Sequence, residues 1–360
     1  MFPYWLLFSL FAIAALTERA RPGAVPGSPG APLQMAAQPA VGPLIPLFLF
    51  MALMIGVRFQ VGADYHSYIN IFSWTSEATF DEAIERGDPG YQFVNWLVGQ
   101  WDGKMWHVNL ICGAIFAWGL MRFCQRQPAP LLAALVAIPY LVTVVAMGYT
   151  RQAVAIGVIM AGLASLDRRG SIPHFVIYVG IAALFHRTAI IALPLAIFAG
   201  RRNHLLNLIA IVLAGLALYY SLLEESVDTL VKNYIEARYG SQGAAIRVAM
   251  NVLPATILLI YSRKLGLTDY SRRFWVLVAL VALACVPALF IVPSTTAIDR
   301  IALYLIPIQI VVFSRLGLLL NGAALGRLMV VAYSFAILFV WLNFAAHAFA
   351  WVPYRTVIEW

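Results

Sequence analysis

The chain has 360 residues, of which 62% are hydrophobic and only 11% are charged. A soluble domain carries about 25% charged residues, so this composition excludes a soluble globular protein and indicates that lipid surrounds most of the chain. The formal net charge of +8 reflects Arg residues that are scattered in short pairs between apolar runs. That pattern is typical of membrane-protein loops, and it argues against a nucleic-acid-binding face.

Apolar runs recur along the whole chain. A spanning helix needs ~20 such residues, and we predict an all-α fold, a polytopic transmembrane helical bundle of about 10–12 spans that forms a single integral-membrane domain over residues 1–360. The predicted spans are 2–16, 41–57, 105–121, 129–147, 152–166, 172–185, 188–200, 205–223, 246–262, 274–292, 301–314 and 328–346. Between 172 and 200, Phe185-His186-Arg187-Thr188 interrupts the apolar run. This interruption predicts either a tight turn at the membrane surface or a broken helix.

The first span is expected to remain in the mature protein. It lacks a basic region before it, and Leu16-Thr17-Glu18 is not a small-residue cleavage site. Residues 17–40, rich in Pro, Gly and Ala, are predicted to be a flexible cytoplasmic linker.

The distribution of basic residues predicts the orientation of the spans. With the N-terminus outside and alternating sides, every cytoplasmic loop holds at least two basic residues, and both termini lie on the outer side. The cytoplasmic loops then receive Arg19, Arg21, Arg122, Arg126, Arg168, Arg169, Arg201, Arg202, Arg263, Lys264, Arg272, Arg273, Arg315 and Arg327.

The largest outer loop, residues 58–104, holds more acidic than basic residues. Thr79 and Glu82 have the spacing of a capping box, which predicts a short surface helix over 80–86. The aromatic-rich stretch 90–101 is typical of a re-entrant or interfacial helix. We therefore expect short amphipathic helices in this loop rather than a simple connection.

Charged residues gather at the outer membrane boundary in this topology, against the positive-inside bias. One interpretation is ion pairing and snorkelling into headgroups. The other is binding of an anionic, lipid-linked substrate, because the planar guanidinium matches phosphate geometry. The residues concerned are Arg58, Asp64, His66, Arg151, His186, Arg187, Arg238, Arg247, Asp299, Arg300 and Arg355.

Two of these residues are candidates for a general base. His186 interrupts an apolar stretch beside Arg187, and a histidine can remove a proton near neutral pH. Asp64 follows the second predicted span beside Gly62-Ala63, and is either a turn former or a catalytic carboxylate. Asp299-Arg300 is either an internal ion pair or a further phosphate clamp.

The sequence offers no pattern for a metal or disulfide framework. The three cysteines are Cys112, Cys124 and Cys285, without CxxC or metal-ligand spacing. P-loop, GxSxG and HExxH motifs do not occur. We expect no metal site and no cofactor.

From about residue 45 to 358, the order of several short motifs resembles the EpsG family of Wzy-like bacterial exopolysaccharide and O-antigen polymerases. Each motif is weak alone, but their order and their common placement on the outer side are more specific. The motifs are Arg58…Gly62-Ala63-Asp64-Tyr65…Tyr68, Asp88-Pro89-Gly90-Tyr91, Arg151-Gln152-Ala153-Val154-Ala155, Phe185-His186-Arg187-Thr188-Ala189, Asp299-Arg300…Tyr304 and Trp351-Val352-Pro353-Tyr354-Arg355.

The resemblance implies a glycosyltransferase that polymerises undecaprenyl-diphosphate-linked oligosaccharide repeat units at the outer face of the bacterial cytoplasmic (inner) membrane. An inverting, metal-independent displacement would suit the residues present. The expected catalytic residues are His186 and Asp64, and the expected diphosphate- or saccharide-binding residues are Arg58, Tyr65, Arg151, Gln152, Arg187, Arg300, Tyr304 and Arg355.

The expected partners are the lipid bilayer, the lipid-linked oligosaccharide, and a chain-length regulator and a flippase of the same pathway. Two other functions remain open. A lipid-linked oligosaccharide flippase should carry its charges mid-span and show symmetric halves, and neither feature is found. A ligase that moves polymer onto a different acceptor would need the same phosphate clamps and base, so the sequence does not separate it from a polymerase.

Overall fold

The computed structural model describes residues 1–18, 44–169, 172–199, 243–292, 295–320 and 322–359. The predicted all-α class is confirmed, since in these ranges the β pairing is limited to an isolated bridge between Arg58 and Thr356. The helices are α1 (Phe2–Thr17), α2 (Leu44–Gly56), α3 (Tyr65–Glu77), α4 (Phe80–Glu85), α5 (Pro89–Gly99), α6 (Met105–Cys124), α7 (Pro130–Ala137), η1 (Ile138–Ala146), α8 (Thr150–Arg169), α9 (Ile172–Phe185), η2 (Arg187–Ile191), α10 (Ala192–Ala199), α13 (Ala244–Tyr261), α14 (Asp269–Ile291), α15 (Thr295–Leu305), α16 (Pro307–Phe313), η4 (Leu316–Leu318), α17 (Ala323–Phe344), η5 (Ala348–Ala350) and η6 (Val357–Glu359).

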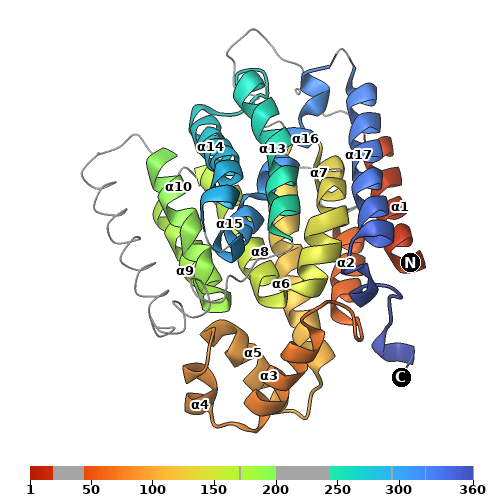
Figure 1. Cartoon of the computed structure of the whole chain (residues 1–360), viewed down its shortest axis with the longest axis vertical. Helices are drawn as coiled ribbons and strands as arrows, with labels where there is room; N and C mark the ends of the chain where they lie inside the picture. Colours follow the sequence, from red (N-terminus) through yellow and green to blue (C-terminus); the bar gives the residue numbers. More distant parts are fainter. Residues whose placement is uncertain (19–43, 170–171, 200–242, 293–294, 321, 360) are drawn as a thin grey trace.

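Most of these helices form one elongated bundle (Figure 1). Five apolar segments are long enough to cross a membrane: Met105–Cys124, Ala244–Tyr261, Asp269–Ile291, Thr295–Phe313 and Ala323–Phe344. Shorter apolar helices accompany them at Phe2–Thr17, Leu44–Gly56, Pro130–Ala146, Thr150–Leu166 and His174–Phe185. The chain is therefore a multi-pass helical membrane protein. The predicted span 205–223 and nearly all of the predicted linker lie outside the described residues.

The predicted span limits differ from the helix limits in one useful way. The predicted spans 152–166 and 301–314 begin just after a charged residue, whereas α8 and α15 begin earlier and carry Arg151 and Arg300 within them. A helix can continue into polar sequence at the membrane boundary, where water and headgroups solvate the charges. Arg151 and Arg300 therefore lie on regular helices, which hold side chains more firmly than loops do.

Two glycines allow α6 and α8 to approach closely. A Cβ atom on Gly119 would lie 1.9 Å from the Gly157 carbonyl oxygen, and one on Gly157 would lie 2.7 Å from the Phe116 Cα atom. Small residues at such crossings let helix backbones touch in a membrane. This contact fixes α8, whose first turn carries Arg151 and Gln152.

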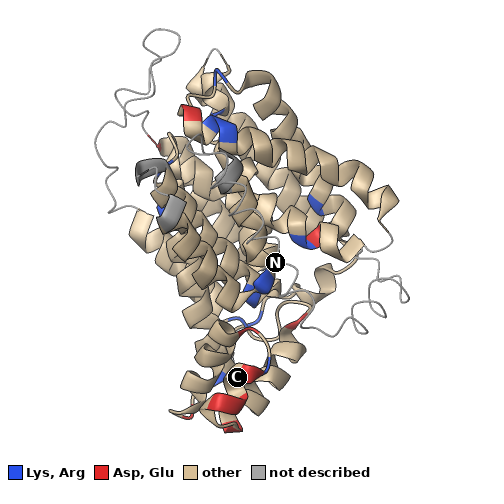
Figure 2. Cartoon of the chain, turned by 90° about the vertical axis from the view of Figure 1, so that its left-hand side faces the viewer, with Lys and Arg blue, Asp and Glu red and all other residues tan. Residues whose placement is uncertain are grey.

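Helices α3, α4 and α5 form a separate lobe beyond one end of the bundle (Figure 1), and acidic residues concentrate there (Figure 2). The capping box predicted from Thr79 and Glu82 is present, and the helix predicted over 80–86 is α4. The interfacial helix predicted over 90–101 corresponds to α5. Helix α3 was not predicted, because its mixed polar and aromatic sequence has neither a clear apolar period nor a side-chain cap.

The C-terminal motif ties three distant helices together. The Trp351 indole N–H donates to the Thr143 carbonyl oxygen at 2.8 Å, within the π-helical segment η1, which contains Pro139 near its start. The Tyr4 hydroxyl donates to the Trp351 carbonyl oxygen at 2.7 Å. The Tyr354 hydroxyl donates to the Met54 carbonyl oxygen at 2.6 Å. These bonds satisfy backbone groups that a π-helix and a helix end leave available.

Candidate functional site

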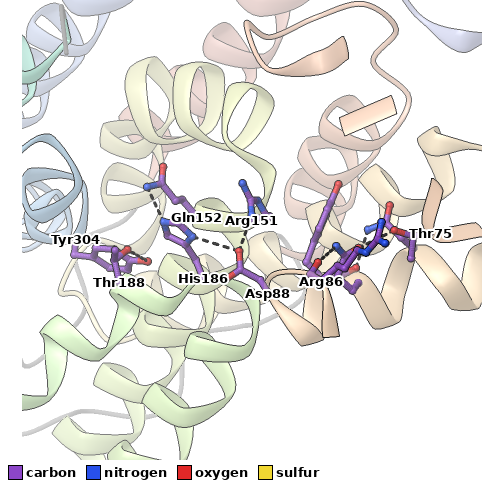
Figure 3. Close-up of polar contacts among 11 residues, drawn as sticks. Thr75, Arg86, Asp88, Arg151, Gln152, His186, Thr188 and Tyr304 are labelled. Atoms are coloured by element: carbon purple, nitrogen blue, oxygen red, sulfur yellow. Dashed lines mark hydrogen bonds and ion pairs between the residues drawn. The ribbon is translucent and has the colours of Figure 1, made fainter. Parts of the chain in front are cut away.

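Four helix ends meet where the lobe joins the bundle, and each brings a polar side chain to the same place. Asp88 precedes α5, Arg151 and Gln152 lie in the first turn of α8, and His186 separates α9 from η2. Figure 3 shows their side chains pointing toward one another. We call Asp88, Arg151, Gln152 and His186 the polar cluster.

Local sequence explains why the Asp88 carboxylate reaches the cluster. Pro89 begins α5, a position where its missing N–H costs nothing. Asp88 occupies the N-cap position, yet its side chain makes no capping hydrogen bond. Just beyond it, Gln92 accepts a hydrogen bond from the Thr75 hydroxyl at 2.9 Å and donates to the Arg86 carbonyl oxygen. This network joins α3 to α5 (Figure 3) and fixes the start of α5.

Asp88 is buried, with 5% of its surface exposed, and is surrounded by donors. Arg151 Nη1 donates to its Oδ2 at 2.8 Å, and the Arg187 backbone N–H also favours the ionised form of the carboxylate. Burial favours a raised pKa, but the interactions with His186 and Arg151 outweigh it, so the pKa of Asp88 lies below its usual value. The carboxylate is therefore ionised at neutral pH.

His186 lies between an amide and this carboxylate. Its Nε2 is 3.0 Å from Gln152 Nε2, an amide nitrogen that can only donate, so Nε2 is the accepting nitrogen and Nδ1 carries the proton. Nδ1 is 3.6 Å from Asp88 Oδ2. That separation exceeds hydrogen-bond length, as catalytic contacts often do before substrate binds, and the attraction is electrostatic.

The protonation state of His186 suits a base. Burial lowers the pKa of His186 below its ordinary value of 6.5, and Asp88 opposes this effect only in part. The charges of Arg151 and Arg300 lower the pKa further. The imidazole is thus neutral near pH 7 and can accept a proton at Nε2.

Arg300 and Tyr304 approach the cluster from α15. The Thr188 hydroxyl lies 3.3 Å from the Tyr304 hydroxyl and donates to it, while Arg300 is near enough to act electrostatically on His186. Arg300 and Arg187 are partly exposed. Within the described part of the chain, neither guanidinium makes an ion pair, whereas Arg151 is held by Asp88. These two arginines are therefore the cations available to a ligand.

Asp64 occupies the N-cap position of α3 and lies near enough to Arg151 to interact with it electrostatically. Its side chain makes no cap hydrogen bond, and it is half-buried near Arg151 and Arg247. Burial raises the pKa of Asp64, and the two arginines lower it by less. Asp64 is thus a carboxylate whose oxygens remain open to a hydroxyl group beside the cluster.

The sequence left two interpretations of Asp299-Arg300, and the structure separates the two residues. Asp299 pairs with Arg247 inside the bundle, and Arg247 Nε also donates to the Tyr140 hydroxyl at 2.7 Å. The Arg247 guanidinium lies 4.9 Å from the centre of the Tyr149 ring. Asp299 therefore forms the internal ion pair, and Arg300 remains on the cluster side.

Three of the predicted site residues lie apart from His186. Arg58 is only 2% exposed and donates to Asn109 Oδ1 at 2.9 Å and Thr150 Oγ1 at 2.8 Å. Arg355 is exposed and donates to Gln60 Oε1 at 2.7 Å. Tyr65 is buried, and its ring packs edge-on against Phe59. Arg58 thus supports the start of α8 next to Arg151, and its guanidinium is enclosed by protein.

Asp88 and Arg247 were not among the residues assigned to the site from the sequence. Asp88 precedes Pro89 in an acidic loop, a pattern that indicates only the start of a helix. Its partner Arg151 is 63 residues away in the sequence. The available signal was the Asp88-Pro89-Gly90-Tyr91 motif. In the described ranges, His, Cys, Asp and Glu side chains form no group of three or more that could hold a metal ion.

Comparison with known proteins identifies one family. The model of the EpsG family matches residues 43–356, which is most of the chain. No curated protein and no solved structure matches the chain significantly.

Proposed function

The chain belongs to the EpsG family, and from this membership, which supports a polysaccharide polymerase-like role, we propose that it polymerises undecaprenyl-diphosphate-linked oligosaccharide repeat units. The growing chain is transferred from its lipid carrier to the non-reducing end of a fresh lipid-linked unit. The reaction occurs at the outer face of the bacterial cytoplasmic membrane, where the lobe lies in the orientation favoured by the basic loops.

The observation that carries the proposal is the buried Asp88–His186 couple beside two available arginines. A sugar hydroxyl is a poor nucleophile and needs a base within hydrogen-bond reach. The acceptor hydroxyl replaces the Gln152 amide as the hydrogen-bond partner of His186 Nε2, which then takes the hydroxyl proton. Asp88 stabilises the resulting imidazolium through Nδ1. This division between a base and an orienting carboxylate is the general arrangement for activating a weak nucleophile.

The bonds balance in a single displacement. The acceptor oxygen forms a bond to the anomeric carbon of the growing chain, and the bond from that carbon to the diphosphate oxygen breaks. The proton goes to His186, and the electron pair leaves with undecaprenyl diphosphate. Attack opposite the leaving group inverts the configuration at the anomeric carbon.

Charge develops on the leaving diphosphate, and Arg300 and Arg187 stabilise it. Donors already fixed where charge appears lower the barrier without reorganisation. Arg151 contributes indirectly by keeping Asp88 ionised. Asp64 accepts a hydrogen bond from a neighbouring hydroxyl of the acceptor sugar and so orients it.

The experiment is reconstitution of the purified protein in vesicles with isolated lipid-linked repeat units, followed by electrophoresis of the products. Wild type and His347→Ala, which removes a histidine outside the cluster, should give a ladder of polymer lengths. His186→Ala should insert normally and give none. A normal ladder from His186→Ala would refute the assignment of His186 as the base. If wild type moved the lipid-linked units from one leaflet to the other and made no polymer, polymerisation would be refuted.

A further inference from the structure

The lobe formed by α3, α4 and α5 supplies both carboxylates of the proposed site. Asp88 is the N-cap residue of α5, and Asp64 is the N-cap residue of α3. The bundle supplies the base, His186 after α9, and the arginines, Arg151 on α8 and Arg300 on α15. The separation of the lobe from the bundle therefore decides the distance between carboxylate and base.

A close backbone contact joins the lobe to the bundle beside the Asp88–His186 couple, where the start of α5 lies next to the end of α9 (Figure 1). A Cβ atom on Gly90 would lie 3.0 Å from the Leu184 Cβ atom and 3.1 Å from the Leu184 carbonyl carbon and oxygen. Gly90 follows Asp88 by two residues, and Leu184 precedes His186 by two. The contact thus lies next to the couple whose Oδ2 and Nδ1 atoms are 3.6 Å apart.

A second glycine makes a similar contact beside the other carboxylate. A Cβ atom on Gly62 would lie 2.3 Å from the Met147 carbonyl oxygen, and the Gly62 N–H donates to the Ala350 carbonyl oxygen at 2.8 Å. Gly62 has a φ of 103°, so any side chain there would strain the backbone as well as the contact. Gly90 has no such φ, and a substitution there changes the contact alone.

A methyl group at Gly90 would act on the spacing rather than on the helix. Gly90 lies in the first turn of α5, and alanine is a better helix former than glycine. Carbon atoms pack best at about 3.5–4.0 Å, so α5 and α9 would have to separate by a few tenths of an ångström. Because Asp88 precedes α5 and His186 follows α9, the gap between them would widen as the helices separate.

We propose that Gly90 is a positioning residue, which sets the distance between Asp88 and His186 by letting the backbones of α5 and α9 touch. The inference rests on the function proposed above, and it adds the residue that keeps the carboxylate of the lobe close to the base of the bundle. Gly90 itself touches no reacting atom and acts through Asp88.

The test follows the His186 imidazole and the polymerisation rate separately. The full-length protein with isotopically labelled histidine rings is titrated in detergent micelles by nitrogen NMR, and the His186 signals are assigned by their loss in His186→Ala. Rates are measured in vesicles with lipid-linked repeat units. The variants are Gly90→Ala, Asp88→Asn, the two combined, and the control Gly180→Ala on α9, where a Cβ atom meets nothing within 4 Å.

The His186 midpoint should move to lower pH in Gly90→Ala, because Asp88 raises the pKa of His186 and would lie farther away. Gly180→Ala should titrate like wild type. Since misplacement by about 1 Å costs about a hundredfold in rate, a few tenths of an ångström should lower the rate at neutral pH about three- to fivefold. In the Asp88→Asn background, Gly90→Ala should change neither quantity further.

An unmoved His186 midpoint in Gly90→Ala would overturn the proposal, and so would an equal loss of rate with and without Asp88. If wild type makes no polymer, the proposed function fails, while the titration still decides the role of Gly90. Should Gly90→Ala not insert, it is combined with Leu184→Gly, which removes the nearest atom and leaves the Leu184 carbonyl group in contact. A midpoint equal to that of Leu184→Gly alone would then overturn the proposal.

Discussion

Asp88 and His186 form a couple in which the carboxylate controls where the imidazole holds its proton. In the proposed reaction Asp88 touches no reacting atom and acts through His186, so its role is one of positioning. A carboxylate needed only for folding and one needed for proton transfer differ in their effect on the pH dependence of polymerisation.

Replacement of Asp88 by Asn should move the acid side of the pH–rate profile. In wild type the rate should fall as pH drops through the lowered pKa of His186, below 6.5. Because Asp88 raises that pKa, its removal should shift the midpoint to still lower pH, and the rate at neutral pH should drop about tenfold or more. The measurement is initial polymerisation rate against pH. An unmoved midpoint would show that Asp88 does not act through His186.

Arg58 and Arg300 were both candidates for substrate binding in the sequence, and the structure places them in different environments. Arg58 joins α2, α6 and α8 through buried hydrogen bonds, so Arg58→Gln should destabilise the protein by about 2 kcal/mol or more. Arg300→Gln should leave the melting temperature unchanged and lower the rate about 100-fold. Thermal melts and rates of both variants separate the roles, and a strongly destabilised Arg300→Gln would contradict the assignment.

The sequence made His186, Arg151 and Arg300 candidates because each interrupts apolar sequence on the expected outer side. It could not identify Asp88 in the same way, since an acid beside Pro89 in a polar loop is common. Nor could it exclude Arg58, which stands at a span end like the others. Only the packing of α2 against α6 shows that Asn109 and Thr150 enclose it.

At the scale of helices, hydropathy located the apolar elements well, and capping chemistry located α4. The failures were α3, whose polar and aromatic residues follow no clear period, and the limits of α8 and α15. The π-helical η1 also could not be foreseen, because it depends on bonds that Thr143 makes locally and with Trp351, 208 residues away.

The contact of α6 with α8 should not tolerate a methyl group. Alanine is better than glycine in a helix by about 0.8–1.0 kcal/mol, yet Gly119→Ala would press its Cβ against the Gly157 carbonyl oxygen. Overpacking costs about 1–3 kcal/mol, so this variant should melt at a lower temperature. Gly180→Ala is the control, since a Cβ there meets nothing within 4 Å. Equal melting temperatures for the two variants would refute the close crossing.

The capping box of α4 should stabilise that helix locally. Thr79→Ala removes the hydroxyl that caps the Glu82 N–H, a loss of ~1 kcal/mol that should speed amide exchange in α4 about fivefold. Thr79→Ser keeps the hydroxyl and should retain protection. Hydrogen exchange of residues 80–85 measures both, and identical protection in the two variants would show that the cap contributes nothing.

At the scale of the whole molecule, the account depends on which side of the membrane the lobe occupies. The described cysteines are all buried, so one introduced cysteine can be labelled selectively. A membrane-impermeant maleimide should label Glu85→Cys, which is exposed on the lobe, in intact cells. It should label Arg263→Cys, exposed at the other end, only after the cells are opened. The reverse pattern would mean that the bundle is inverted.

The lipid-linked glycan profile tests polymerisation most directly. Cells lacking the protein are compared with cells that carry wild type or only His186→Ala, and the lipid-linked units on each leaflet are measured with the length of the polymer. The account predicts that single units accumulate on the outer leaflet in both defective strains and that polymer is absent. Polymer of normal length with His186→Ala, or units accumulating on the inner leaflet, would contradict it.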